Sequence, residues 1–141
     1  MKHSRPIQLE EHLENFDMEA CSIDKSLKIF GQKYALHVIR NMLLLKQYKF
    51  GQFLGSIEGI NTKTLSIRLH ELEGFGLIKR TIIKSRPAQT EYSLTDKGRA
   101  LAPVLEQMAA LLMKHCAKDI FKDKKPRMLK EVFGYETTHN K

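Results

Sequence analysis

The chain has 141 residues, of which 42% are hydrophobic and 28% are charged; this is typical of a folded globular domain and excludes a largely disordered chain. Its formal net charge of +8 favours an anionic partner such as nucleic acid. Two cysteines are too few for a disulfide-stapled secreted domain, and neither a signal peptide nor an apolar run of ~20 residues is visible, so we expect a cytoplasmic protein without membrane contact.

The amino-terminal part of the chain predicts three helices. Residues 1–20 carry a net charge of −3 and form an N-terminal helical arm. A second helix is expected over residues 23–30, with Ser22 or Asp24 as its cap. Residues 33–45 follow as a third helix, because their apolar positions form a wide stripe on one side.

Residues 50–94 carry the most informative pattern in the sequence. Four apolar residues at the spacing i, i+3, i+4 and i+7 predict a short helix with one buried face: Phe50, Phe53, Leu54 and Ile57. Glu58-Gly59-Ile60 supplies a turn, and a second helix is expected over residues 62–75, with Asn61 as its cap. Three leucines of that helix should face the core: Leu65, Leu69 and Leu72. The order helix, turn, helix is typical of an element that places one helix in a DNA major groove.

A β-hairpin with a basic tip is expected after Gly76, which should end the second helix in the left-handed conformation. Residues 77–84 and 90–94 are rich in β-branched and aromatic residues and predict antiparallel strands, with a proline-containing tip between them. From residue 61 to residue 99 there are eight Lys and Arg against four Asp and Glu, so the basic excess lies on the second helix and the wing. The predicted fold class is therefore mainly α (α+β), a winged helix-turn-helix with a two-stranded β-wing over residues 50–94.

The carboxy-terminal part predicts a long dimerisation helix over residues 95–121, capped by Thr95 and bent at Pro103. Its apolar residues form a face broader than one chain's core needs: Leu101, Val104, Leu105, Met108, Leu111, Leu112 and Met113. A symmetric second chain would cover such a face, so we expect a homodimer with the N- and C-terminal helices at its interface. We expect residues 122–141 to form a basic tail with one short helix, and residues 1–141 together to form a single winged-helix domain.

The outer face of the second helix and the wing tip provide the candidate DNA contacts. Side chains suited to phosphates or base edges are Asn61, Thr62, Lys63, Thr64, Ser66, Ile67, Arg68, His70, Lys84, Ser85, Arg86 and Gln89. Ile67 could touch a thymine methyl group, and Arg86 could enter a minor groove, where negative potential favours arginine. The ordinary alternatives at single positions are a solvated basic face, a pair between Arg68 and Glu71, or an exposed histidine at position 70.

Constellations of an enzyme or of a metal site are not visible in the sequence. The six histidines are scattered, and there is no Cys-x-x-Cys, His-Glu-x-x-His, phosphate-binding glycine loop or nucleophile elbow. We therefore expect no enzymatic activity, no metal and no cofactor.

Several segments resemble a known family when they are taken together. They are Cys21, Gly31-Gln32-Lys33-Tyr34, Lys49-Phe50-Gly51-Gln52-Phe53, the run from Gly59 to Arg80, and Tyr92-Ser93-Leu94-Thr95-Asp96-Lys97-Gly98. Over about residues 20–115 the chain resembles the HxlR-type winged-helix transcription regulators, which are relatives of the MarR type. The resemblance implies a homodimer on a pseudo-palindromic operator in double-stranded DNA, with half-sites about one helical turn apart.

Two alternative functions stay open at this point. Cys21 resembles the position that some family members use as a thiol sensor, which would make the chain a redox-sensing or electrophile-sensing regulator; a buried, inert thiol is the other interpretation. The winged helix could also be a protein–protein adaptor without an operator of its own.

Overall fold

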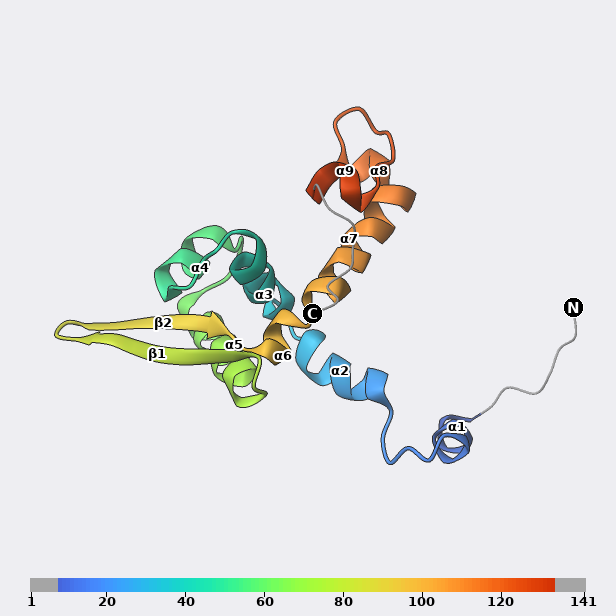
Figure 1. Cartoon of the computed structure of the whole chain (residues 1–141), viewed down its shortest axis with the longest axis horizontal. Coiled ribbons are helices and arrows are strands. Elements are labelled where there is room, and N and C mark those ends of the chain that lie inside the picture. Colours follow the sequence, from blue (N-terminus) through green and yellow to red (C-terminus); the bar gives the residue numbers. More distant parts are fainter. Residues whose placement is uncertain (1–7, 134–141) are drawn as a thin grey trace, which may run out of the picture. The chain divides into compact units, whose positions relative to one another are not determined.

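The computed structural model describes residues 8–133, and the chain divides into two compact units after Lys33. The first unit contains α1 (Leu9–Asn15) and α2 (Ser22–Phe30), both labelled in Figure 1. The prediction that Ser22 or Asp24 caps the second helix is wrong. The amide of Lys25 already donates a hydrogen bond to the carbonyl of Cys21, so the helix begins one residue earlier and Cys21 is its N-cap residue.

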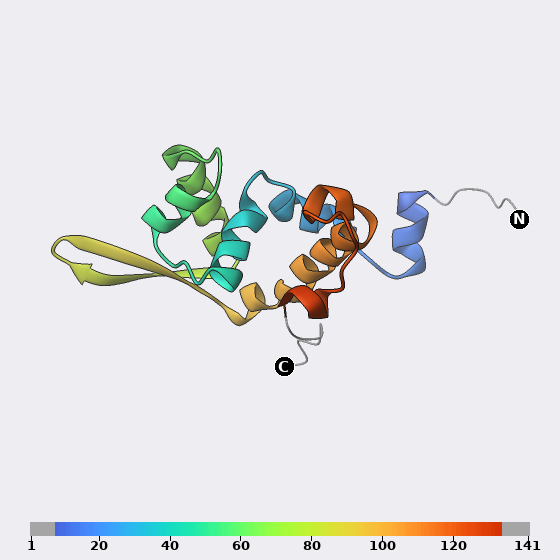
Figure 2. The ribbon, with the colours of Figure 1, turned by 90° about the horizontal axis from the view of Figure 1, so that it is seen from above.

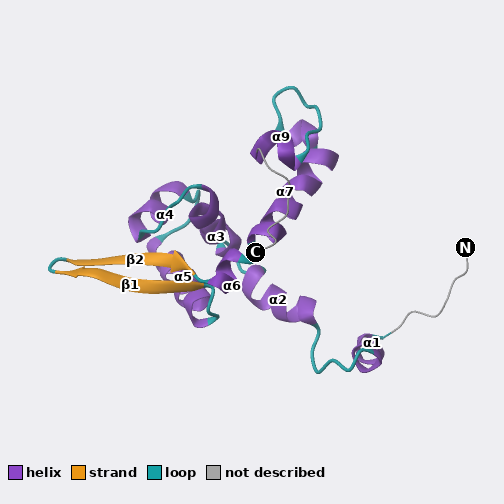
Figure 3. Cartoon of the chain, in the orientation of Figure 1, coloured by secondary structure: helices purple, strands orange, loops and turns teal. Residues whose placement is uncertain are grey.

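The second unit consists of helices and one antiparallel two-stranded sheet (Figures 1 and 3). Its described elements are α3 (Ala35–Leu44), α4 (Phe50–Ser56), α5 (Thr62–Gly74), β1 (Ile78–Ser85), β2 (Ala88–Leu94), α6 (Asp96–Arg99), α7 (Ala102–His115), α8 (Ala117–Ile120) and α9 (Leu129–Phe133). This is the predicted mainly helical winged helix-turn-helix. The helix-turn-helix is α4 and α5, and the wing is the hairpin of β1 and β2.

The core of the second unit is built where α3, α4 and α5 meet the root of the wing. Its fully buried apolar side chains are Val38, Ile39, Met42, Phe53, Leu65, Leu72, Leu77 and Ile78. The predicted leucine row of α5 is confirmed, because Leu65, Leu69 and Leu72 are all buried. Leu54 was predicted to be buried on α4 but is 37% exposed, since Phe53 and Ile57 already fill the contact of that short helix with the core.

The wing is longer, and its turn tighter, than the sequence pattern predicts. The strands extend to the pairs Lys84–Gln89 and Ser85–Ala88, so only Arg86 and Pro87 connect them. Figures 1 and 2 both show the distal part of the hairpin projecting beyond α4 and α5. Among the described residues, the root of the hairpin packs on the rest of the second unit through Ile78 in β1, the contact of Tyr92 with Phe53 and the hydrogen bond from the amide of Tyr92 to the carbonyl of Tyr48.

The predicted long helix over residues 95–121 is wrong as a continuous element. The structure has the one-turn helix α6, then α7, then the one-turn helix α8. Thr95 caps α6, where its hydroxyl accepts a hydrogen bond from the amide of Gly98. Pro103 lies in the first turn of α7, where a missing N–H costs little, so it begins a helix instead of bending one.

Two contacts fix the helix-turn-helix on α3. Tyr34 has a left-handed backbone at the start of α3, and a Cβ atom added to Gly59 would lie 2.9 Å from its hydroxyl. Gly59 itself has a φ of +80° in the turn before α5, a conformation that glycine adopts without steric cost. At the other end of α3, the buried amide nitrogen of Asn41 donates hydrogen bonds to the side chains of Gln47 and Ser56, both at 2.9 Å.

Within the described part of the chain, no helix combines the length and the apolar character needed to cross a bilayer.

Candidate nucleic-acid interface

The outer face of α5 presents a row of polar and basic side chains opposite the buried leucines. Thr62, Lys63, Ser66 and His70 are exposed, and Ile67 among them is 44% exposed. These side chains can reach phosphates and base edges because the helix backbone is held from behind by packing. The sequence prediction for this face is therefore matched in exposure, while the contacts to DNA remain predictions.

Three of the side chains predicted to contact DNA at α5 either make hydrogen bonds within the protein or are only partly accessible. The side-chain oxygen of Asn61 accepts a hydrogen bond from the amide of Thr64 at 2.8 Å, which is the predicted N-cap. Thr64 is half-buried. The guanidinium of Arg68 donates to the carboxylate of Glu71 at 2.7 Å, so the pair considered as an alternative is present. Arg68 is thus held on the flank of the helix.

The wing brings a second group of predicted contacts together near its turn. Lys84, Ser85, Arg86 and Gln89 are all exposed, and Lys84 pairs directly with Gln89 across the hairpin. Residues 78–94 contain four Lys and Arg and one acidic residue, so the hairpin is a basic projection. Such a projection is suited to the phosphate backbone or to a narrow minor groove.

The root of the wing is tied to the end of α5 by interactions that spacing in the sequence did not reveal. The hydroxyl of Thr95 donates to the carbonyl of Gly76 at 2.6 Å. The ammonium group of Lys97 donates to the carbonyl of Phe75 at 2.8 Å and lies 4.0 Å from the centre of its ring. Gly76 has a φ of +82°, which confirms the predicted left-handed end of the helix. These contacts fix the direction of the wing relative to α5.

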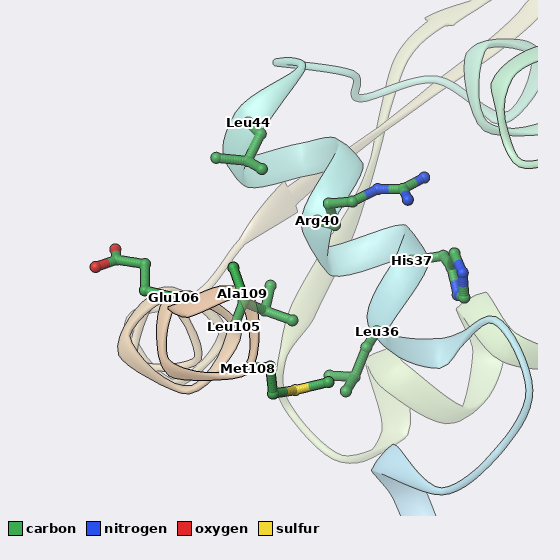
Figure 4. A pocket seen from close by; sticks show the side chains of 8 residues that line it. All are labelled: Leu36, His37, Arg40, Leu44, Leu105, Glu106, Met108 and Ala109. Carbon is green, nitrogen blue, oxygen red and sulfur yellow. The ribbon is translucent and has the colours of Figure 1, made fainter. Parts of the chain in front are cut away.

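A mostly apolar cleft of about 240 Å³ lies between α3 and α7 (Figure 4). Figure 4 shows Leu36, Leu105 and Met108 between the two helices, whereas the polar ends of His37 and Arg40 point away from α7. Burial, and then the nearby charge of Arg40, lower the pKa of His37 below its ordinary value. The cleft is an apolar gap, and the charged or polar residues of its lining are His37 and Arg40 on α3 and Glu106 on α7.

The two cysteines are not paired, and both are half-buried. In the first unit, Cys21 lines a hollow of about 420 Å³ together with Leu9, Leu13, Ala20, Asp24, Lys25 and Lys28. Among residues 8–133, no group of three or more His, Cys, Asp and Glu side chains is arranged to hold a metal ion.

Comparison with known proteins agrees with this geometry. The model of the HxlR-like helix-turn-helix family matches residues 29–120. The HTH-type transcriptional regulator sll1512 of Synechocystis sp. is 38% identical over 91 residues, which are 64% of this chain and 67% of that protein. It and the other similar curated proteins carry the names of regulators, which confirms the prediction that the chain is not an enzyme.

Two solved structures illustrate the similarity in three dimensions. A regulator assigned to the MarR family from Porphyromonas gingivalis W83 has a TM-score of 0.59 at 32% identity and covers 69% of this chain and 94% of that one. The redox regulator HypR in its oxidised form has a TM-score of 0.59 at 29% identity and covers 65% of this chain and 94% of that one.

Proposed function

Because the chain belongs to the HxlR-like helix-turn-helix family of transcriptional regulators, we propose that it binds double-stranded DNA sequence-specifically as a homodimer. In each protomer α5 lies in the major groove, and the wing over residues 84–90 lies on the adjacent backbone or minor groove. The observation that carries the proposal is the arrangement of α5, with three leucines buried behind it and a polar, basic face exposed in front.

The proposed roles follow from side-chain chemistry and exposure. Lys63, Lys84 and Arg86 neutralise phosphates, and Arg86 at the turn of the hairpin is placed to reach into the minor groove. Base edges are read by side chains on the exposed face of α5: Thr62, Ser66, Ile67 and His70. Three residues act by positioning α5, since each is half-buried or hydrogen-bonded within the protein: Asn61, Thr64 and Arg68. On the wing, hydrogen bonds to the DNA backbone come from Ser85 and Gln89.

The dimer is supported by the apolar face of α7, which the described part of the same chain leaves exposed. Its exposed members are Val104, Met108, Leu111 and Leu112. Four large apolar side chains on one helix are a larger patch than scattered surface residues produce, and a twofold-related copy would bury them symmetrically. Two α5 helices would then read half-sites about one helical turn, ~34 Å, apart.

The experiment begins by selecting duplexes from a random library with the full-length protein. Affinity for the selected duplex is then measured against salt concentration. We expect log K to fall linearly with log salt, because each neutralised phosphate releases counterions. The double variant Lys63→Glu/Arg86→Glu should bind roughly 100-fold more weakly, at about 1–3 kcal/mol per contact.

The matched control is Lys122→Glu/Lys125→Glu, which makes the same change in net charge on the exposed segment between α8 and α9. It should retain most of the affinity. Equal losses in the two variants would show that only total charge matters, and the proposed interface would be wrong. A selection that yields no preferred duplex would favour the adaptor function instead.

A second function, sensing of oxidants or electrophiles through Cys21, is supported by the similarity to the redox regulator HypR and by the partial exposure of Cys21 in a hollow beside Lys25 and Lys28. The test is release from the selected duplex by diamide in the wild type, in Cys21→Ser and in Cys116→Ser. Loss of the response in Cys21→Ser alone supports sensing by this thiol. An unchanged response in Cys21→Ser contradicts it.

A further inference from the structure

The distal part of the wing carries two adjacent apolar side chains that the core does not use. Ile82 is 60% exposed and Ile83 is 48% exposed, whereas Ile78 at the root of the same strand is buried. Figures 1 and 2 show why, since this part of the hairpin extends beyond α4 and α5. Two neighbouring β-branched side chains in water on a projecting hairpin need an explanation beyond the packing of the domain.

Cross-strand packing within the hairpin does not supply that explanation. Ile82 faces Thr90 in the register, Thr81 before it faces Glu91, and Lys84 two residues after it faces Gln89, so no apolar side chain lies opposite. The register advances two residues in β1 but only one in β2 between the pairs Ile82–Thr90 and Lys84–Gln89, so Ile83 is the extra residue of a β-bulge. A bulge changes the direction of side chains and places consecutive residues where strict alternation would separate them.

The charges around the two isoleucines indicate which surface they meet. Lys79, Arg80, Lys84 and Arg86 flank them along the chain, and Glu91 is the one acidic residue of the hairpin segment 78–94. An apolar groove on a protein would leave these four basic side chains without partners. An anionic surface with an apolar recess would match both the basic side chains and the two isoleucines. The minor groove of DNA is such a surface, because phosphates line its edges while sugars and base edges form its interior.

We propose that Ile82 and Ile83 form an apolar wedge that enters the DNA minor groove beside the half-site read by α5, while Lys84 and Arg86 hold the phosphates on its edges. The wedge contacts sugar walls and opens a base step, so it reads the deformability of the flanking sequence and not its hydrogen-bond pattern. This inference rests on the proposed function, and it assigns to the wing a specificity that basic contacts alone do not provide.

The wedge predicts a different signature from a phosphate contact. Ile82→Ala/Ile83→Ala should weaken binding to the selected duplex roughly 30-fold, since about half of each side chain remains available for burial. The slope of log K against log salt should not change, because no charge is removed. Arg86→Gln should instead reduce that slope by about 0.9.

The geometry of the DNA provides an independent measurement. A 2-aminopurine placed at flexible pyrimidine–purine steps flanking the half-site should brighten when the wild type binds, because an inserted side chain unstacks the base. The double alanine variant should lose this signal at saturating protein. Ile82→Val/Ile83→Val should keep most of it, since valine retains the branched apolar shape.

The control variant is Leu45→Ala, which removes a comparably exposed apolar side chain at the end of α3, away from the wing, from α5 and from the proposed dimer face. It should bind like the wild type, and circular dichroism and sedimentation should show that all variants are folded in the same oligomeric state.

If the double alanine variant binds DNA and unstacks the base like the wild type while Arg86→Gln still weakens binding, the wedge is wrong and the proposed function stands. If no variant on the wing or on α5 changes binding, the proposed function fails as well. If instead the alanine variant abolishes association between protomers, the isoleucines contact protein and the inference is overturned.

Discussion

Asn41 is a polar side chain at the centre of the junction of α3 with the helix-turn-helix. It is fully buried, and its amide nitrogen donates to Gln47 and Ser56 while its oxygen accepts from Nε of Arg40 at 2.9 Å. Asn41→Ala deletes all three hydrogen bonds and keeps the two that the Asn41 backbone carbonyl accepts from the amides of Leu45 and Gln47. The change therefore isolates the side-chain contribution.

The expected cost is about 2–3 kcal/mol in the free energy of unfolding. Each hydrogen bond contributes on the order of 1 kcal/mol net, and the partial exposure of Arg40 and Ser56 lets water compensate part of the loss on their side. For a chain of this size that energy lowers the melting temperature by roughly 10 °C. The assay is urea and thermal unfolding followed by circular dichroism at one fixed protein concentration, because association would otherwise shift the apparent stability.

The control is Ser26→Ala, which removes an exposed hydrogen bond from the Ser26 hydroxyl to the carbonyl of Ser22 within α2. Its cost should be within about 0.5 kcal/mol of zero. If Asn41→Ala costs no more than this control, the buried network does not stabilise the junction and the reasoning is refuted.

Three further predictions concern the turn, the wing root and pH. Gly59→Ala should lower the free energy of unfolding by about 1–2 kcal/mol, because φ is +80° and the new methyl group meets the hydroxyl of Tyr34. In a double-mutant cycle, Tyr34→Phe should restore part of this free energy. Simple additivity of the two changes would contradict the contact. Lys97→Met should cost about 1 kcal/mol and weaken DNA binding, measured by unfolding and by anisotropy, while Lys118→Met does neither. The pKa of His37 is lowered in the folded protein, so the unfolded chain binds the proton at a higher pH than the folded chain does. The free energy of unfolding should therefore fall as pH drops through the ordinary value of 6.5. His37→Gln should reduce this dependence of the free energy of unfolding on pH, and an unchanged dependence would show that His37 is not the group responsible.

Most features of α5 could be predicted because the sequence signals that define this helix lie within or next to it. The spacing of the three leucines predicted the buried side of α5, Asn61 predicted where the helix begins, and Gly76 predicted where it ends. The structure confirms these three predictions. The outer face follows from these by geometry alone. The Arg68–Glu71 pair was also visible in the sequence, but only as one of two possibilities, since spacing i, i+3 permits a pair without requiring it.

Other features depend on contacts that are distant in the sequence. The apolar pattern of residues 95–121 is compatible with one helix, and its interruption reflects the packing of α6 on the root of the wing, through Thr95 and Gly98. The exposure of Leu54 likewise depends on what Phe53 and Ile57 already occupy. The β-bulge at Ile83 depends on the register of two strands, which residue preferences do not specify.

Gly98 determines which part of the wing can bend. A Cβ atom at this position would collide with the carbonyl oxygen of Leu77, immediately before β1, so α6 and the base of the hairpin touch backbone to backbone. The two-stranded ribbon is thus rigid where it leaves the domain and unsupported toward Pro87. We expect thermal bending to be concentrated in its outer half, which in the proposed complex would let α5 stay fixed while the wing follows differences in groove width between binding sites.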